Sequence, residues 1–278
     1  MINDRFDTIY FNGCSFTEGG GFEALKFSLK EAYKEKYGFE YDSEKDVCYP
    51  TLVGNKTGIK IVNDGKSGSG ADRIIRKAYE YIRKYPKSVV EKTLFIFEVP
   101  TAINRLDLFS NKYQMHMVGN VVYNDEYIGI KDAQCAINWI YGPQLDATYR
   151  KETTELLIKY SEYFIDVVKW ELDVAYKFLG LFSYFELNGI DYYISGDLTY
   201  FVNRIKMDKY IPNFLDKHVM QIVINDKIEN DIVTMADNNK CKIYHEVGKD
   251  ISNDGHPGFQ AHRLWADGIV NFLNNKYI

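Results

Sequence analysis

This chain of 278 residues has neither closely spaced cysteines nor a long basic segment, and each absence excludes a class of protein. The four cysteines lie far apart and form no Cys-x-x-Cys pair, which argues against a zinc site or a disulfide framework and favours a reducing compartment. The net charge is −5, and no block of lysine or arginine reaches the length of a nucleic-acid-binding arm. We therefore do not expect nucleic acid as a partner.

The chain also lacks a membrane-spanning run and an export signal. No stretch approaches the ~18 consecutive apolar residues of a transmembrane helix. The N-terminal residues MINDRFDTIYFNG do not show the basic and then apolar pattern of a signal peptide. We expect a soluble, cytoplasmic protein with no membrane partner.

What is present is a repeated alternation of short apolar runs and helical patterns. The strand-like runs cover residues 7–12, 59–63, 93–99, 190–195 and 241–246. The helical patterns cover residues 22–37, 71–84, 152–187 and 258–275. The third is long enough for two helices or one bent helix, and Gly180 is the candidate break. Strand followed by helix, repeated, predicts a three-layer α/β/α fold with a mainly parallel sheet of about five strands.

Residues 1–278 are interpreted as one domain, because the chain shows no repeat, low-complexity tract or linker. Two regions interrupt the alternation, at about 107–150 and 197–240, and we interpret them as insertions. In the first, MHMVGNVVY resembles two short strands around Gly119 and Asn120. The chain holds 23 Tyr and 17 Phe, a content compatible with sugar stacking or with simple coding bias.

The first polar loop, GCSFT at 13–17, follows the first strand-like run. The carboxyl ends of parallel strands line the ligand crevice of such a sheet, so Ser15 could present its hydroxyl there as a nucleophile. From this segment alone, a turn serine that caps the next helix is the more typical interpretation. Cys14 is a second candidate nucleophile, although a thiol at this position is more typical of a small buried side chain.

Two further loops carry polar groups that suit the same site. The loop NDGKSGSG at 63–70 precedes a helix, and its backbone N–H groups suit an oxyanion or a phosphate, or it is simply a flexible connection. In SNDGHPG at 252–258, Asp254 can orient the Nδ1 of His256 and leave Nε2 as a base. The alternative is a surface turn with an incidental histidine.

Together these segments resemble three sequence blocks of the SGNH (GDSL-type) hydrolases. GCSFT is similar to the nucleophile block, with Cys14 where Asp is commonest, and Gly68 best matches the oxyanion glycine of the second block. DGHPGFQAHRLWA is similar to the last block, although its spacing is Asp-x-His in place of the more usual Asp-x-x-His. The resemblance implies a flavodoxin-like fold and a catalytic triad of Ser15, Asp254 and His256, with no metal or organic cofactor.

The third block of that family is where this chain departs from the pattern. The family has Gly-x-Asn after the middle strand, whereas residues 98–105 here read EVPTAINR. Asn104 could reach back as an oxyanion donor, or it could be a helix cap or a surface residue. Loss of one such donor typically costs ~3 kcal/mol of transition-state stabilisation. Glu18 and Asp64 lie near the expected site, but nothing in the sequence singles them out.

The resemblance implies a serine esterase acting on a small-molecule or carbohydrate acyl ester, including O-acetyl groups. One alternative is a protein that keeps the fold with weak or lost catalysis and acts as a binding or structural component, which the missing Asn favours. A second alternative is a phosphate- or nucleotide-binding protein that uses the SGSG loop. This last interpretation leaves the turn with Asp254 and His256 unexplained.

Overall fold

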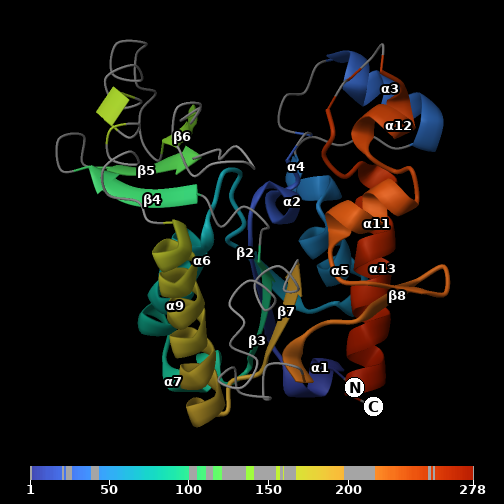
Figure 1. The fold of residues 1–278 in the computed structure, drawn as a ribbon. Coiled ribbons are helices and arrows are strands. Elements are labelled where there is room, and N and C mark those ends of the chain that lie inside the picture. Colours follow the sequence, from blue (N-terminus) through green and yellow to red (C-terminus); the bar gives the residue numbers. More distant parts are fainter. Residues whose placement is uncertain are drawn as a thin grey trace.

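The centre of the molecule is a parallel sheet of four strands. The computed structural model describes residues 2–20, 22, 27–38, 44–99, 105–110, 115–120, 136–140, 155–156, 159, 167–196, 217–249, 252 and 254–277. The strands lie in the order β2-β1-β3-β7. Their bounds are β1 (Thr8–Asn12), β2 (Lys60–Asn63), β3 (Thr93–Val99) and β7 (Tyr192–Gly196) (Figure 1).

The register aligns the carboxyl ends of these strands. Thr8 of β1 pairs with Lys60 of β2 and with Thr93 of β3, and Phe95 of β3 pairs with Tyr192 of β7. Every residue of β1, β3 and β7 is buried, as expected for parallel strands that are covered on both faces. The three-layer α/β/α prediction is therefore confirmed.

The fifth predicted strand, at residues 241–246, is wrong. Most of this segment belongs to a helix, α12 (Ile243–Val247). Its backbone donors serve a neighbouring loop and not the sheet, because the N–H of Ile243 donates to the carbonyl of His256 at 2.9 Å. The place beside β7 is taken by a single parallel bridge between Ile194 and Val219.

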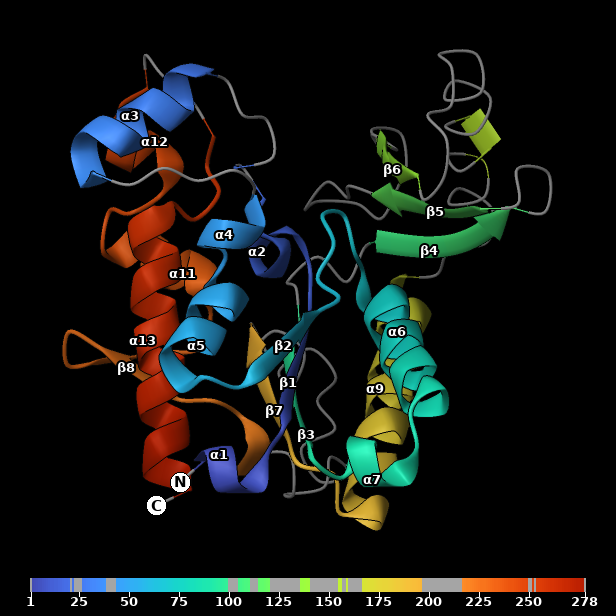
Figure 2. The ribbon, with the colours of Figure 1, turned by 180° about the vertical axis from the view of Figure 1, so that it is seen from behind.

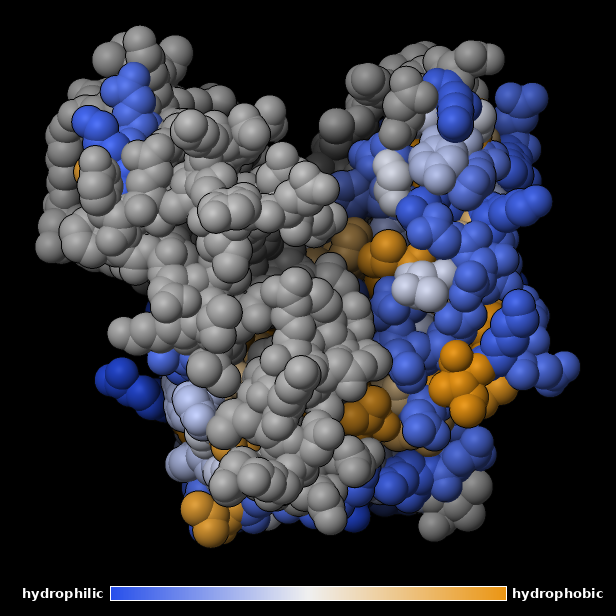
Figure 3. Space-filling model, viewed as in Figure 1, coloured by the Kyte–Doolittle hydropathy of each residue, from blue (hydrophilic) through white to orange (hydrophobic). Residues whose placement is uncertain are grey.

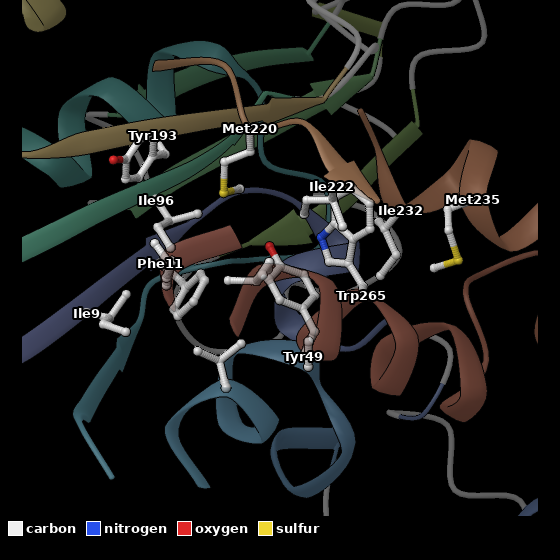
Figure 4. Close-up of a cluster of buried hydrophobic side chains, with 14 of the residues drawn as sticks. Ile9, Phe11, Tyr49, Ile96, Tyr193, Met220, Ile222, Ile232, Met235 and Trp265 are labelled. Atoms are coloured by element: carbon white, nitrogen blue, oxygen red, sulfur yellow. The ribbon is translucent and has the colours of Figure 1, made fainter. Parts of the chain in front are cut away.

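Helices cover both faces of the sheet (Figures 1 and 2). One face carries α5 (Tyr49–Thr57), α11 (Ile232–Asn238), α13 (Phe259–Lys276) and the short α1 (Ile2–Arg5). The other carries α6 (Ala71–Lys84), α7 (Lys87–Val90) and α9 (Val167–Asn188). On β1, Ile9 and Phe11 enter the first apolar layer with Trp265 (Figure 4), whereas Tyr10 enters the second. Alternate residues of one strand thus supply two cores.

The helix α9 runs without interruption through Gly180, so the predicted break there is wrong. Its buried residues Phe178, Phe182 and Phe185 pack into the second core, and this burial outweighs the ~1 kcal/mol that a helical glycine costs relative to alanine. The predicted end of the helix is confirmed, because Gly189 follows α9 with a φ of 64°.

The region predicted as the first insertion contains a separate antiparallel sheet of β4 (Arg105–Ser110), β5 (Met115–Asn120) and β6 (Ala136–Ile140). The turn expected at Gly119 and Asn120 is wrong. Both residues pair with β4 and β6, and a register shift follows Val118. A local irregularity of this kind accommodates a glycine inside a strand.

The second region contains a hairpin of β8 (Ile222–Ile224) and β9 (Lys227–Glu229). Asn225 and Asp226 form its turn with φ angles of 50° and 61°, which suits a two-residue hairpin loop. On the face shown in Figure 3, the surface over α11 and α13 is mostly hydrophilic. None of the helices in the described ranges has the length and hydropathy needed to cross a bilayer.

Three more helices lie beyond the carboxyl end of the sheet: α2 (Ser15–Glu18), α3 (Phe27–Tyr37) and α4 (Glu44–Val47). The helix α3 packs beside α12 in both views (Figures 1 and 2). Phe22, Tyr33, Val47 and Ile243 form a small apolar cluster there. These segments surround the end of the sheet at which the three polar loops meet.

Candidate active site

Ser15 begins a one-turn helix directly after β1. Cys14 has an extended backbone at the N-cap, and the left-handed Gly19 (φ 98°) ends the turn by donating its N–H to the carbonyl of Ser15 at 2.9 Å. This abrupt change from strand to helix holds Ser15 at the carboxyl end of the central strand. Its side chain is largely buried, and Cys14 is 1% exposed.

A chain of hydrogen bonds joins Ser15, His256 and Asp254, although the first and last lie at opposite ends of the sequence. The Nε2 of His256 lies 3.2 Å from the Oγ of Ser15. On the other side of the ring, Nδ1 lies 2.6 Å from the Oδ1 of Asp254. If Nδ1 carries the proton toward the carboxylate, Nε2 is left to accept the hydroxyl proton of Ser15.

The carboxylate of Asp254 is held in its charged form. The hydrogen bond with the His256 ring lowers the pKa of Asp254 below its ordinary value, and the backbone N–H of His256 adds a second bond at 2.9 Å. Both side chains are about one third exposed. The ring of Phe16 packs against the imidazole at 5.7 Å between centroids. The histidine is thus oriented on one side and accessible on the other.

The loop that carries Asp254 and His256 is tied to α12 and to Lys242, the residue before it. Lys242 and Pro257 form an isolated antiparallel β-bridge, and the N–H of Tyr244 donates to the carbonyl of Asp254 at 3.2 Å. Glu246 accepts the N–H of Gln260 at 2.8 Å, in the first turn of α13. Burial raises the pKa of Glu246 to about 7. These contacts explain why residues 241–246 do not join the sheet.

Gly20 occupies a position that leaves no room for a side chain. Its N–H donates to the carbonyl of Ser15 at 2.6 Å. A Cβ on Gly20 would lie 2.7 Å from the Cβ of Ser15 and 3.2 Å from the Cδ2 of His256. Gly20 was not among the residues predicted from the sequence, although the run Gly19-Gly20-Gly21 is a visible signal for close backbone approach.

The loop at 64–70 lies against the Ser15 turn. Lys66 N–H donates to the carbonyl of Gly13 at 3.2 Å, and the side chain of Asn63 donates to the carbonyl of Thr17 at 2.8 Å. Gly68 is left-handed, with a φ of 80°. Among the described residues, none accepts a hydrogen bond from the N–H of Ser15 or Gly68. Asn104, the third predicted donor, lies outside the described residues.

A buried cluster of hydroxyls and one carboxyl group lies beneath the turn. The hydroxyl of Thr17 donates to Glu98 near the end of β3, and the Tyr49 hydroxyl donates to the same oxygen at 3.2 Å. Burial raises the pKa of Glu98 to about 7 and that of Tyr49 well above its ordinary value. This cluster was not predicted from the sequence, although Glu98 is the one charged residue in the run TLFIFEV.

His262 also lies near the site, but it is buried away from solvent. Its Nδ1 accepts the N–H of Tyr49 at 3.2 Å, and burial lowers its pKa to about 3, with a smaller contribution from His256. Because a ring with so low a pKa is a poor proton acceptor, His262 does not supply a second general base. Within the described ranges, no group of three or more His, Cys, Asp or Glu has an arrangement suited to a metal ion.

Comparison with known proteins found similarity in solved structures alone. No family model and no curated protein matches the chain. A protein assigned to the G-D-S-L lipolytic family from Desulfitobacterium hafniense DCB-2 is 12% identical, with a TM-score of 0.41 over 96% of this chain and 99% of that one. A carbohydrate esterase with divergent catalytic and non-catalytic binding functions is 12% identical, with a TM-score of 0.46 over 97% of this chain and 69% of its own.

The acetyl xylan esterase Est2A from Butyrivibrio proteoclasticus is 14% identical, with a TM-score of 0.44. That comparison covers 97% of this chain and 64% of Est2A, so the chain spans less than two thirds of that enzyme. At such identities the chemistry of the site has to be argued from its own geometry.

Proposed function

We propose that this protein is a serine esterase of the SGNH type that hydrolyses small acyl esters, a class that includes O-acetyl groups on carbohydrate. The observation that carries the proposal is the unbroken chain of hydrogen bonds from Asp254 through His256 to the Oγ of Ser15, at 2.6 and 3.2 Å. We would not expect an incidental histidine in a surface turn to lie within hydrogen-bonding distance of a buried serine from another loop.

In the first half of the reaction, the Oγ of Ser15 attacks the ester carbonyl while the Nε2 of His256 takes the hydroxyl proton. Asp254 stabilises the resulting imidazolium, which then gives its proton to the leaving alkoxide as the C–O bond breaks. In the second half, His256 removes a proton from water, which attacks the acyl-enzyme. The acid leaves and Ser15 regains its proton, so no cofactor is required.

The negative charge on the carbonyl oxygen needs donors that face the attacking serine. The N–H groups of Ser15 and Gly68 are the two candidates in the described part of the chain, and Asn104 is a third candidate outside it. Two backbone donors are sufficient for a working oxyanion hole, as they are in the Ser-His-Asp proteases. The absence of Asn from the third family block is therefore compatible with catalysis.

The proposal is tested by hydrolysis of p-nitrophenyl acetate and by labelling with a phosphonofluoridate. We expect turnover by the wild type, a loss of at least about 10³-fold in Ser15→Ala, and a label that maps to Ser15. Ser195→Ala is the matched control, since Ser195 is also buried near the end of a sheet strand but its hydroxyl donates to the carbonyl of Phe97 at 3.4 Å.

Acetylated sugars are assayed in parallel, because an artificial ester can be rejected for its alcohol. Turnover of neither substrate by folded protein, together with no labelling, would reject the esterase. The binding or structural interpretation of the same fold would then be preferred.

A further inference from the structure

Glu18, the last residue of the Ser15 turn, holds that turn to the loop carrying Gly68. The Oε2 of Glu18 accepts the backbone N–H of Ser67 at 2.6 Å, and its Oε1 pairs with the ammonium group of Lys66. The side chain of Glu18 is 11% exposed, whereas that of Lys66 is 34% exposed. A short bond from a backbone N–H to a carboxylate that is mostly shielded from water is stronger than one between neutral groups.

The position of this bond in the chain gives it a consequence for the site. Glu18 lies three residues after the proposed nucleophile, on the same helical turn. Ser67 lies one residue before the proposed oxyanion donor Gly68, and the N–H of Gly68 belongs to the peptide that joins these two residues. The carboxylate thus spans from the element that supplies the attacking oxygen to the element that supplies an N–H for the oxyanion.

Other contacts bring the two elements together but hold different points. Gly65 touches Thr17 so closely that a Cβ there would lie 2.7 Å from the Cβ of Thr17. Lys66 N–H reaches Gly13 at 3.2 Å. Both contacts hold the first part of the loop, whereas the Glu18 bond holds the residue directly before Gly68 (Figures 1 and 2 show the loop between β2 and α6 beside α2).

We propose that Glu18 is a positioning residue of the esterase, which fixes the N–H of Gly68 relative to the Oγ of Ser15. The inference rests on the proposed function and adds to it a requirement on geometry. Preorganised donors contribute to catalysis only when they lie at hydrogen-bonding distance from the oxyanion, so a loop that is free to move loses that contribution. Glu18 touches neither substrate nor the reacting atoms in this role.

The test compares Glu18→Ala, Glu18→Gln and the wild type by kcat, KM and the inhibition constant of phenylboronic acid. The boronate forms a tetrahedral adduct with the nucleophile and places an oxygen in the oxyanion hole. In Glu18→Ala we expect kcat to fall by about 10- to 100-fold, KM to stay within about threefold, and boronate affinity to fall in parallel with kcat. Glu18→Gln keeps an oxygen for Ser67 and should recover most of both.

Glu229→Gln is the matched control for removing a buried carboxylate. Glu229 lies on β9, is 4% exposed and accepts hydrogen bonds from the side chain of Asn238 on α11. The Glu229→Gln variant should leave kcat and boronate affinity within about twofold of the wild type. If Glu18→Ala fails to fold, Glu18→Asp decides in its place, because a side chain shorter by one methylene cannot hold Ser67 in the same position.

The inference is overturned if Glu18→Ala, or Glu18→Asp where Glu18→Ala does not fold, keeps the kcat of the wild type. It is also overturned if kcat falls without any loss of boronate affinity, or if kcat falls as much in Glu229→Gln as in the Glu18 variant. Failure of the proposed function has a different signature. In that case the wild type itself shows no turnover and no boronate binding, whereas failure of the inference alone leaves a wild type that is inactivated by Ser15→Ala.

Discussion

Two carboxyl groups flank the Ser15 turn, and their surroundings give them opposite properties. Asp254, on the loop that follows α12, is one third exposed and bonded to an imidazole, which lowers its pKa. Glu98, beneath the turn, is 3% exposed and bonded to hydroxyl groups, and burial raises its pKa to about 7. Solvation and the partner group thus decide whether a carboxyl group stays a fixed charge or takes up a proton near neutral pH.

This contrast separates two contributions to the site. Asp254 contributes an orienting charge that acts directly on His256. Glu98 contributes shape, because it holds the Thr17 hydroxyl two residues after Ser15 and receives the Tyr49 hydroxyl from α5. Removing the charge should therefore affect the reaction, whereas altering the buried carboxyl group should affect stability.

The largest expected effect is that of Asp254→Ala on catalysis. Without the carboxylate, His256 loses its orientation and the stabilisation of its charged form, so kcat should fall by about 10³- to 10⁴-fold. Circular dichroism should show an intact fold, because the backbone of Ile243 and Tyr244 still holds the loop. Glu98→Gln, measured beside it, should keep kcat within about tenfold. Equal losses in the two variants would remove the distinction between them.

The second prediction concerns the pH dependence of stability in Glu98→Gln. Because folding raises the pKa of Glu98 from 4.5 to about 7, the folded state binds an extra proton between these values. The stabilisation from the neutral group is complete below the unfolded pKa and is lost as pH rises through about 7. From pH 4.5 to 8, the wild type should therefore lose ~3 kcal/mol of unfolding free energy relative to the variant.

This difference is measured by urea unfolding of both proteins across that pH range. Glu246 also has a pKa raised to about 7, but it is present in both proteins and its contribution cancels in the difference. Asp254 has the opposite sign, since its contribution is present above the unfolded pKa and is lost as pH falls through the lower, folded value. Parallel stability curves for wild type and variant would show that folding does not shift the pKa of Glu98.

Gly20→Ala should disturb the alignment of Ser15 and His256 without removing any reacting group. The added Cβ would press on Ser15 at 2.7 Å and on His256 at 3.2 Å, and displacement of either should lower kcat by about 30- to 100-fold. Steady-state kinetics with p-nitrophenyl acetate measures the effect. Unchanged kcat would mean that the turn moves aside at no loss to the alignment of Ser15 and His256.

Gly180→Ala is the smallest expected effect and the control for adding a methyl group to a glycine. A Cβ at Gly180 meets nothing within 4 Å, and the residue lies inside the continuous helix α9. The substitution should raise the free energy of unfolding by about 0.5–1 kcal/mol and leave kcat unchanged. A loss of stability would indicate that the helix needs the glycine.

The elements that the sequence predicted well are those with strong local signals. The run at 93–99 and the helix at 71–84 are found with the same bounds, because an uninterrupted apolar run and a sustained helical period depend on neighbours in the chain. Residues 241–246 have an equally strand-like pattern, yet they pair with the loop of His256. Local propensity there is overridden by a partner that lies elsewhere in the sequence.

The same division applies to the candidate site. Ser15, Gly68, Asp254 and His256 could be predicted as site residues because each stands in a short segment whose residue types suit one chemical task. Glu98 was visible only as an unexplained charge, because its partners Thr17 and Tyr49 come from other elements. Long-range side-chain contacts of this kind leave no period or spacing in the sequence.

By itself, the sequence determined the alternation of strand and helix, the positions of the three polar loops and the residue types available for nucleophile, base and orienting carboxylate. Only the tertiary structure decided that Ser15 and His256 lie 3.2 Å apart, that Asp254 and Glu98 have opposite pKa shifts, and that Glu18 holds the loop of Gly68. The physical reason is that distance, solvation and hydrogen-bond partners are set by segments that meet only when the chain is folded.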